Sequence, residues 1–178
     1  MSKSARRTRS IILTALFAAL TAIGAFLRIP VGPTSFTLQV FFTCAAGLLI
    51  GPWYGAASQA VYVLLGLAGV PIFTEGGGLM YVTMPTFGFL LGLIPMALVI
   101  GLMTRRENCG FWRMVLACVV GLVVLYAIGL PYMYIALNGA WSLKKTIISG
   151  CLIFLPFDAL KIAVSSLLGS RLQRVLRR

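Results

Sequence analysis

Histidine is absent from this sequence, and acidic side chains are nearly so: aspartate and glutamate account for 3 of the 178 residues. The four cysteines (Cys44, Cys109, Cys118 and Cys151) form no CxxC pair. Zinc and iron–sulfur sites need clustered cysteine, histidine or carboxylate ligands, so we expect no metal site. The sequence also has no GxSxG motif, no P-loop and no evident nucleophile–base set. These absences predict a chain that is not an enzyme, holds no cofactor and does not itself hydrolyse ATP.

Charge is scarce as well, and long apolar runs take its place. Charged residues make up 10% of the chain and hydrophobic residues 60%, with a mean hydropathy of +1.01, whereas soluble domains carry about 25% charged residues. A helix that spans the bilayer needs about 20 apolar residues. We therefore predict an all-α integral membrane protein in which residues 1–178 form a single transmembrane domain. The six predicted transmembrane helices cover residues 10–29, 36–50, 54–70, 86–103, 111–137 and 146–168.

The placement of the basic residues predicts the orientation. The net charge is +12, but the lysines and arginines gather at the ends of apolar runs, which is typical of topology signals rather than of nucleic-acid binding. Four precede the first run, three lie between the fourth run and the start of the fifth (Arg105, Arg106 and Arg113, the last at the beginning of the fifth run), and four follow the last. The opposite side carries only Arg28, Lys144 and Lys145. Because positive residues are retained in the cytoplasm, both termini are predicted to be cytoplasmic.

Asp158 and Lys161 are the sharpest candidates for a functional site. They are the only charges deep inside a predicted span, where a charge costs at least ~2.5 kcal/mol. Their i, i+3 spacing puts them on one helix face with Phe154 and Ser165, and Pro156 is expected to loosen the helix beside them. One interpretation is a polar ligand site, in which the carboxylate accepts N–H donors and the ammonium meets an anion. The other is an ion pair that only orders the bundle.

A run of glycines marks the longest weakly apolar loop. Gly76, Gly77 and Gly78 follow Glu75 there, and consecutive glycines let a backbone approach a ligand closely. The loop is interpreted either as a lid over an extracellular pocket or as a flexible connector.

A stripe of small residues runs along the first predicted helix. It contains Ala15, Ala18, Ala19 and Ala22, and small residues four apart let another helix pack closely. The partner is either another helix of this chain or a separate membrane protein.

Several segments of the sequence form an ordered set. They are residues 35–39 (SFTLQ), 46–55 (AGLLIGPWYG), 65–73 (LGLAGVPIF) and 156–161 (PFDALK). With the Ala15-x-x-x-Ala19 helix, this order resembles the BioY family, the biotin-binding S-components of energy-coupling factor (ECF) vitamin transporters. The resemblance covers nearly the whole chain. It implies a six-helix S-component bundle in the plasma membrane of a prokaryote.

The resemblance also implies a function and partners. An S-component captures biotin at the extracellular side and delivers it by associating with a transmembrane coupling protein and two ATPase subunits, which use the ATP. The alanine stripe would dock on the coupling protein. Asp158 would accept from the ureido N–H groups of biotin, and Lys161 would pair with the valerate carboxylate. The implied substrate-binding residues are Asp158, Lys161, Gly76, Gly77, Gly78, Tyr81, Thr86, Phe87, Gln39 and Phe36.

The sequence departs from the family pattern beside the fourth span. Many members have Pro-Thr-Gly-Gly-Tyr where this chain has Thr86, Phe87, Gly88 and Phe89 after the proline, and some place an asparagine in the glycine loop. Fewer polar contacts to a ureido ring make lipoate, or a related ring-bearing carboxylate, an alternative substrate. A self-contained proton-coupled carrier that uses Asp158 and Lys161 is a second alternative, and a structural scaffold is a third.

Overall fold

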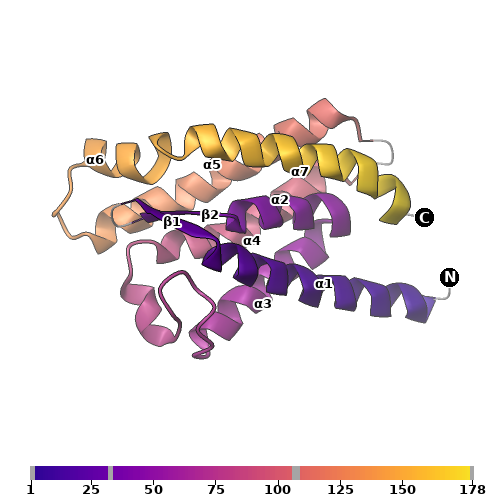
Figure 1. Cartoon of the computed structure of the whole chain (residues 1–178), viewed down its shortest axis with the longest axis horizontal. Coiled ribbons are helices and arrows are strands. Elements are labelled where there is room, and N and C mark those ends of the chain that lie inside the picture. The colour runs from indigo at the N-terminus through magenta and orange to yellow at the C-terminus, as the bar shows by residue number, and fades with distance from the viewer. Residues whose placement is uncertain (1–2, 32–33, 106–108, 177–178) are drawn as a thin grey trace.

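Helices account for most of this computed structural model, which describes residues 3–31, 34–105 and 109–176. They run roughly along its long axis, and both termini lie at one end (Figure 1). The polar break at 106–108 and the last two arginines, used above to predict orientation, lie outside the described residues. The helices are α1 (Lys3–Phe26), α2 (Gln39–Ile50), α3 (Pro52–Leu67), α4 (Phe87–Met103), α5 (Phe111–Ala136), α6 (Leu143–Ile147) and α7 (Leu155–Leu176).

The last predicted span is a composite rather than one α-helix. After α6 comes a π-helical turn, η2 (Ile148–Leu152), and α7 begins three residues later. Pro156 lies in the first turn of α7, where its missing N–H costs no helical hydrogen bond. The proline therefore starts a helix instead of loosening the middle of one. The segment also reaches from 143 to 176 instead of the predicted 146–168.

A short antiparallel hairpin joins α1 to α2 and was not predicted. Strand β1 (Arg28–Val31) pairs with β2 (Thr34–Thr37), and Ile29 lies opposite Phe36. The second helix consequently begins at Gln39 and not at 36. Apart from this hairpin, the predicted all-α membrane bundle is confirmed.

The helix α4 lies at the centre of the bundle, packed against α2, α3 and most extensively α5. Glycines make the α4–α5 approach close. A Cβ on Gly92 would lie 2.9 Å from a methyl of Leu125, and one on Gly129 would lie 2.3 Å from the ring of Phe89. Small residues let helix backbones approach in membranes, where lipid provides no hydrophobic force to press helices together.

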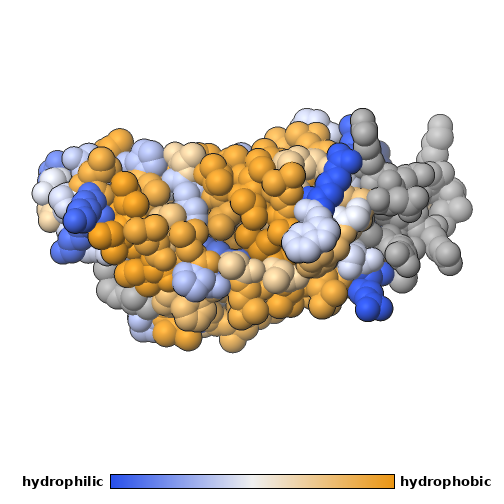
Figure 2. Space-filling model, turned by 90° about the horizontal axis from the view of Figure 1, so that it is seen from above, coloured by the Kyte–Doolittle hydropathy of each residue, from blue (hydrophilic) through white to orange (hydrophobic). Residues whose placement is uncertain are grey.

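The outer surface of the bundle is apolar along its middle and polar at both ends (Figure 2). Large side chains such as Trp112, Leu64 and Leu160 are more than 60% exposed, which a water-soluble surface would rarely tolerate over such an area. Three segments of the described chain, 7–26, 111–136 and 143–172, are long and apolar enough to cross a membrane, and α2 and α4 are shorter apolar helices. The chain is a multi-pass membrane protein.

The helix α1 divides its small residues between two faces. Ala18 is 5% exposed and packs inside the bundle, with Ala22 partly buried against the same core. Ala15 and Ala19 are exposed on the outside. Ala18 therefore serves packing within this chain, and the docking prediction narrows to Ala15 and Ala19.

The segment between α3 and α4 is held by a buried aromatic ring. Phe73 is fully buried and packs edge-on against Tyr62 and tilted against Tyr81 in the short 3₁₀ helix η1 (Leu79–Thr83). The loop glycines serve the backbone here. Gly76 has φ +113°, and a Cβ on Gly77 would lie 2.3 Å from the carbonyl oxygen of Val70. This segment is a packed structure rather than a free connector.

Substituting Gly66 by alanine is expected to destabilise this packed segment. The new Cβ would lie 2.1 Å from the Phe73 ring, and overpacking of this kind costs about 1–3 kcal/mol. We expect the melting temperature in detergent to fall by roughly 2–12 °C. Gly110→Ala is the matched control, because a Cβ there meets nothing within 4 Å. Equal melting temperatures for the two variants would contradict the close contact between Gly66 and Phe73.

Candidate functional site

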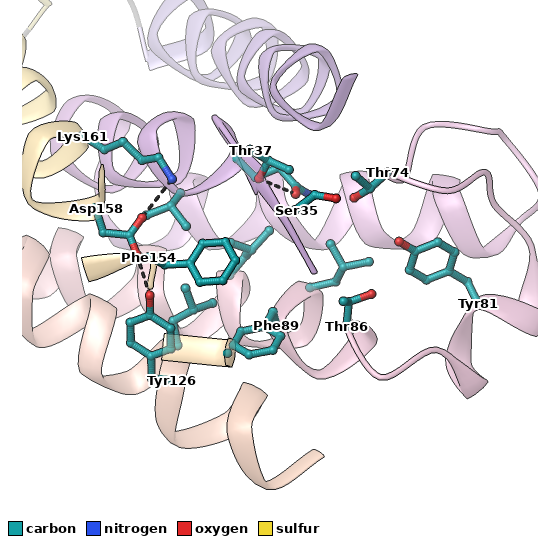
Figure 3. Close-up of a pocket in the computed structure, with 16 residues that line it drawn as sticks. Ser35, Thr37, Thr74, Tyr81, Thr86, Phe89, Tyr126, Phe154, Asp158 and Lys161 are labelled. Atoms are coloured by element: carbon teal, nitrogen blue, oxygen red, sulfur yellow. Dashed lines mark hydrogen bonds and ion pairs between the residues drawn. The ribbon is translucent and has the colours of Figure 1, made fainter. Parts of the chain in front are cut away.

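An elongated pocket lies between the hairpin, the α3–α4 segment and helices α2, α4, α5 and α7. In Figure 3 its side chains fall into three groups: Asp158, Lys161 and Tyr126 at one end, the rings of Phe89 and Phe154 in the middle, and hydroxyl-bearing residues at the other end. The pocket is lined by Ser35, Thr37, Gln39, Val40, Thr74, Tyr81, Thr86, Phe89, Leu90, Leu93, Leu125, Tyr126, Gly150, Phe154, Asp158 and Lys161.

The charged end of the pocket is a three-residue hydrogen-bonded group. The Lys161 Nζ donates to Asp158 Oδ1 at 2.9 Å, and the Tyr126 hydroxyl donates to Asp158 Oδ2 at 2.6 Å. The Asp158 side chain is 3% exposed and that of Lys161 11%. The pair is therefore close to neutral as a unit, which is the arrangement that lets charges persist inside a membrane protein. Both oxygens of the carboxylate are oriented before any ligand arrives.

The break before α7 explains the position of Asp158. Because α7 begins at Leu155, Asp158 lies in its first turn, where the partial positive charge of the helix end favours a carboxylate. Lys161 follows one turn later on the same face. Tyr126 comes from the middle of α5, 32 residues away in sequence. Packing of α5 against α7 is what brings the three together.

Gln39 joins the other part of the pocket to a buried polar network. Its Oε1 accepts from the Thr37 hydroxyl at 2.9 Å, and its Nε2 donates to the Tyr62 hydroxyl at 2.9 Å. Tyr62 in turn donates to the carbonyl of Ile72. The network links the hairpin to α2, α3 and the α3–α4 segment, so the elements that carry Thr37 and Thr74 are held to one another.

A second part of this network lies deeper among the helices. The fully buried Gln59 donates through Nε2 to Thr21 and Ser58 at 3.2 and 3.0 Å, and its Oε1 accepts from Thr43 at 3.1 Å. Hydrogen bonds between helices substitute for water in a membrane interior. Because these amide atoms are satisfied within the bundle, we assign the Gln59 group to structure rather than to ligand binding.

The structure brings together half of the predicted substrate residues. Asp158, Lys161, Gln39, Tyr81 and Thr86 all line the pocket. The other predicted residues lie behind the lining or beside it. Phe36 packs against Phe154, which does line the pocket, and Phe87 is buried against Tyr132. From the glycine loop, Thr74 lines the pocket, whereas Gly76, Gly77 and Gly78 do not.

Tyr126 is the most informative residue that the sequence interpretation missed. It lies within a 26-residue apolar helix, with no nearby motif to single it out. The signal that was available is chemical: a buried phenol needs a hydrogen-bond partner, and Asp158 needed one as well. The hydroxyls of Ser35, Thr37 and Thr74 were missed because their convergence depends on the unpredicted hairpin and on the buried Phe73 loop.

These features define the class of the protein. A multi-pass helical bundle encloses a pocket that has an acceptor and a donor side by side at one end, an apolar middle and neutral hydroxyls at the other. This is the lining expected of a membrane protein that binds a small elongated ligand with polar groups at its ends.

Comparison with known proteins places the chain within that class. The model of the BioY family matches residues 1–178. A probable biotin transporter BioY from Lysinibacillus sphaericus is 42% identical over 175 residues, covering 96% of this chain and 89% of that protein. The biotin transporter BioY of Thermotoga maritima is 36% identical over 168 residues, covering 94% and 97%. The chain belongs to the BioY family.

A solved structure shares the fold. The S-component for biotin from an ECF-type ABC transporter superposes with a TM-score of 0.85, covering 98% of this chain and 95% of that one at 24% sequence identity. The S-component-like bundle predicted from the sequence is confirmed.

Proposed function

We propose that this chain is the biotin-binding subunit of an ECF-type importer. The observation that carries the proposal is the pocket with Asp158 beside Lys161 at one end, in a chain of the BioY family. Its similarity to proteins described as biotin transporters favours a transport subunit over an enzyme, a self-contained carrier or a scaffold.

The geometry of the pair favours the ureido ring as its partner. A ureido group presents a carbonyl acceptor directly beside N–H donors. Asp158 Oδ1 and Lys161 Nζ are 2.9 Å apart, so a carboxylate acceptor and an ammonium donor lie side by side in complementary order. A carboxylate has about four acceptor sites and an ammonium three donors, and only some of these are used within the group. The ring can therefore bind without breaking the ion pair.

The same distance argues against placing the two ends of biotin on the two members of the pair. The valerate chain separates the ureido ring from the carboxylate in an extended ligand, whereas Asp158 and Lys161 are in direct contact. We infer that Lys161 serves the ureido carbonyl. The valerate then runs past Phe154 and Phe89, and its carboxylate reaches the hydroxyls of residues such as Thr37, Thr74 and Tyr81 (Figure 3).

Ligand entry requires the pocket to widen. Its volume is about 100 Å³, while small-molecule sites usually measure about 300–1,000 Å³. The hydroxyl end is formed by the β1–β2 hairpin and the α3–α4 segment, and such connecting segments move more readily than packed helices. We expect the α3–α4 segment and the hairpin to shift outward as biotin enters, while the α4–α5–α7 end stays in place.

Calorimetry on the purified chain in detergent, with biotin and lipoate in parallel and without ATP, tests the substrate. Lipoate has no ureido group to satisfy the Asp158–Lys161 pair, so we expect biotin to bind at least a hundredfold more tightly. Tight lipoate binding with weak biotin binding would mean that the substrate is lipoate and not biotin. Binding of neither ligand would refute the proposal.

Replacing Tyr126 by phenylalanine is expected to weaken biotin binding at least tenfold. The ring stays, but the hydroxyl that holds Asp158 Oδ2 at 2.6 Å is lost, and a hydrogen bond to a charged group is worth about 1.5–3 kcal/mol. Titration calorimetry measures the change, with Tyr134→Phe on the outside of the same helix as control. Unchanged affinity in Tyr126→Phe would show that the carboxylate needs no second anchor.

We further propose that the chain acts with a transmembrane coupling protein and two ATPase subunits, with both termini cytoplasmic. Both termini lie at one end of the bundle (Figure 1), as an even number of spans requires. The hydroxyl end of the pocket is formed by loops at the opposite end, so this orientation opens the pocket to the outside. Labelling of a Thr83→Cys variant with a thiol reagent added outside intact cells tests the orientation. Labelling only after permeabilisation would show that the termini lie outside and the pocket opens to the cytoplasm.

A further inference from the structure

A second concavity lies on the outside of the bundle, where α6 and η2 diverge from α5. It has a volume of about 650 Å³ and opens laterally, toward the surface that faces lipid. From α5 it is lined by residues between 119 and 134, and from the last segment by residues between 143 and 155. The full lining is Val119, Leu122, Val123, Tyr126, Ala127, Leu130, Pro131, Tyr134, Leu143, Thr146, Ile147, Cys151 and Leu155.

The lining of this lateral groove suits a hydrocarbon chain. Most of its side chains are aliphatic, and two of its three hydroxyl groups, those of Tyr126 and Thr146, are hydrogen-bonded within the chain. The Thr146 hydroxyl donates to the Ser142 carbonyl at 3.2 Å, and the Tyr126 hydroxyl is turned away to Asp158. A hydrocarbon chain in the groove would therefore contact apolar side chains and would leave few polar groups of the protein without a hydrogen bond.

Two exposed lysines lie on the short helix α6, which supplies part of the groove's lining. Lys144 and Lys145 are exposed on α6, within the same turn as the groove-lining Leu143 and Thr146. The Lys145 ammonium lies 4.5 Å from the centre of the Trp141 ring. Tryptophan and lysine together at the end of an apolar span mark the headgroup level of a bilayer. Polar residues gather at this end of the α6–α7 face, beyond the apolar band (Figure 2).

We propose that the lateral groove is a binding site for one anionic phospholipid, with an acyl chain along the groove and its phosphate on Lys144 and Lys145. The two lysines on α6 favour this occupant over a zwitterionic lipid, since positive juxtamembrane side chains attract anionic headgroups. The site is separate from the biotin pocket, but the two share a wall, because Tyr126 lines both. A bound acyl chain would press on the back of the ring whose hydroxyl holds Asp158.

Native mass spectrometry of the full chain tests this site, with phosphatidylglycerol and phosphatidylcholine as competing probes. We expect at least fivefold preferential retention of phosphatidylglycerol. The double change Lys144→Gln with Lys145→Gln should remove the preference, and Ala127→Trp, which fills the groove, should remove retention of both lipids. Matched controls are Arg171→Gln at the other end of the last segment and Leu116→Trp on the lipid-facing side of α5, away from the groove.

Photolabelling gives a second measurement that does not depend on how the variants fold. Phosphatidylglycerol with a photoreactive acyl chain should label peptides from residues 119–134 and 143–155 of the unaltered chain. Equal retention of the two lipids, or labelling spread evenly over all helices, would overturn the proposal. If the unaltered chain is dimeric in native mass spectrometry and only Ala127→Trp makes it monomeric, the groove binds a second copy of the chain. That result would also overturn the lipid proposal.

Discussion

Lys161→Ala is expected to weaken biotin binding by more than tenfold, and to weaken binding of biotin amide by the same factor. Lys161 lies 2.9 Å from Asp158 at the end of the pocket away from the loops, where we place the ureido ring. A charge-assisted hydrogen bond contributes about 1.5–3 kcal/mol, and its loss also leaves the Asp158 carboxylate with the Tyr126 hydroxyl as its remaining side-chain partner among the described residues. Both ligands carry the same ring, so both should lose the same contact. Calorimetry with the two ligands on the two proteins gives the four affinities needed.

The comparison separates two roles for the lysine. If Lys161 instead paired with the valerate carboxylate, as the family resemblance first suggested, the variant would lose affinity for biotin and keep its affinity for the uncharged amide. Arg171→Ala serves as the control, because it removes a positive charge from the same helix at an exposed position outside the pocket. An unaltered affinity for both ligands would remove Lys161 from the site. Elution as a single species in gel filtration shows that each variant is folded.

Ala15→Trp and Ala19→Trp are each expected to impair uptake strongly and to spare ligand binding. Both alanines are exposed on α1 and lie outside the pocket lining, so biotin affinity should stay within twofold. A large ring at either position would prevent a coupling helix from packing closely on α1. Uptake of labelled biotin by proteoliposomes that contain all subunits and ATP should fall at least tenfold.

The control for this prediction lies on a different helix. Leu116 is 56% exposed on α5, and Leu116→Trp should leave uptake unchanged. Uptake that survives in both alanine variants would refute docking through this face. Loss of biotin binding in either variant would show that α1 supports the pocket directly.

Sequence patterns predicted the helices because apolar run length nearly determines them in a membrane. The fifth predicted span, 111–137, agrees with α5 to one residue despite Pro131 inside it. The hairpin was missed because its strands are four residues each, too short for a period-2 pattern to stand out, and because proline and glycine around it are equally typical of a linker. Its pairing depends on contact between residues that only the fold brings together.

Sequence alone predicted the site residues that are charged within an apolar span. It did not predict the common residues whose role depends on how the helices pack. Asp158 and Lys161 stand out because charge is costly in lipid. Thr37 and Tyr126 are ordinary residues whose roles come from one hydrogen bond each. The glycine loop was wrongly predicted to line the pocket, because its composition is typical of a ligand-binding loop. Gly76 instead allows a positive φ, and Gly77 allows the close approach of the Val70 carbonyl. Thr74 is the residue of this loop that lines the pocket.

The neutrality of the Asp158–Lys161 pair has an electrical consequence. The site holds one negative and one positive side chain in direct contact, so an arriving biotin adds a single uncompensated charge. Moving a unit charge through the whole membrane potential changes the energy by about 2.3 kcal/mol per 100 mV. With the carboxylate held at the loop end, that charge enters almost none of the field, and the affinity for biotin in polarised proteoliposomes should be independent of voltage. The electrical work then falls on the step that releases the anion to the other side.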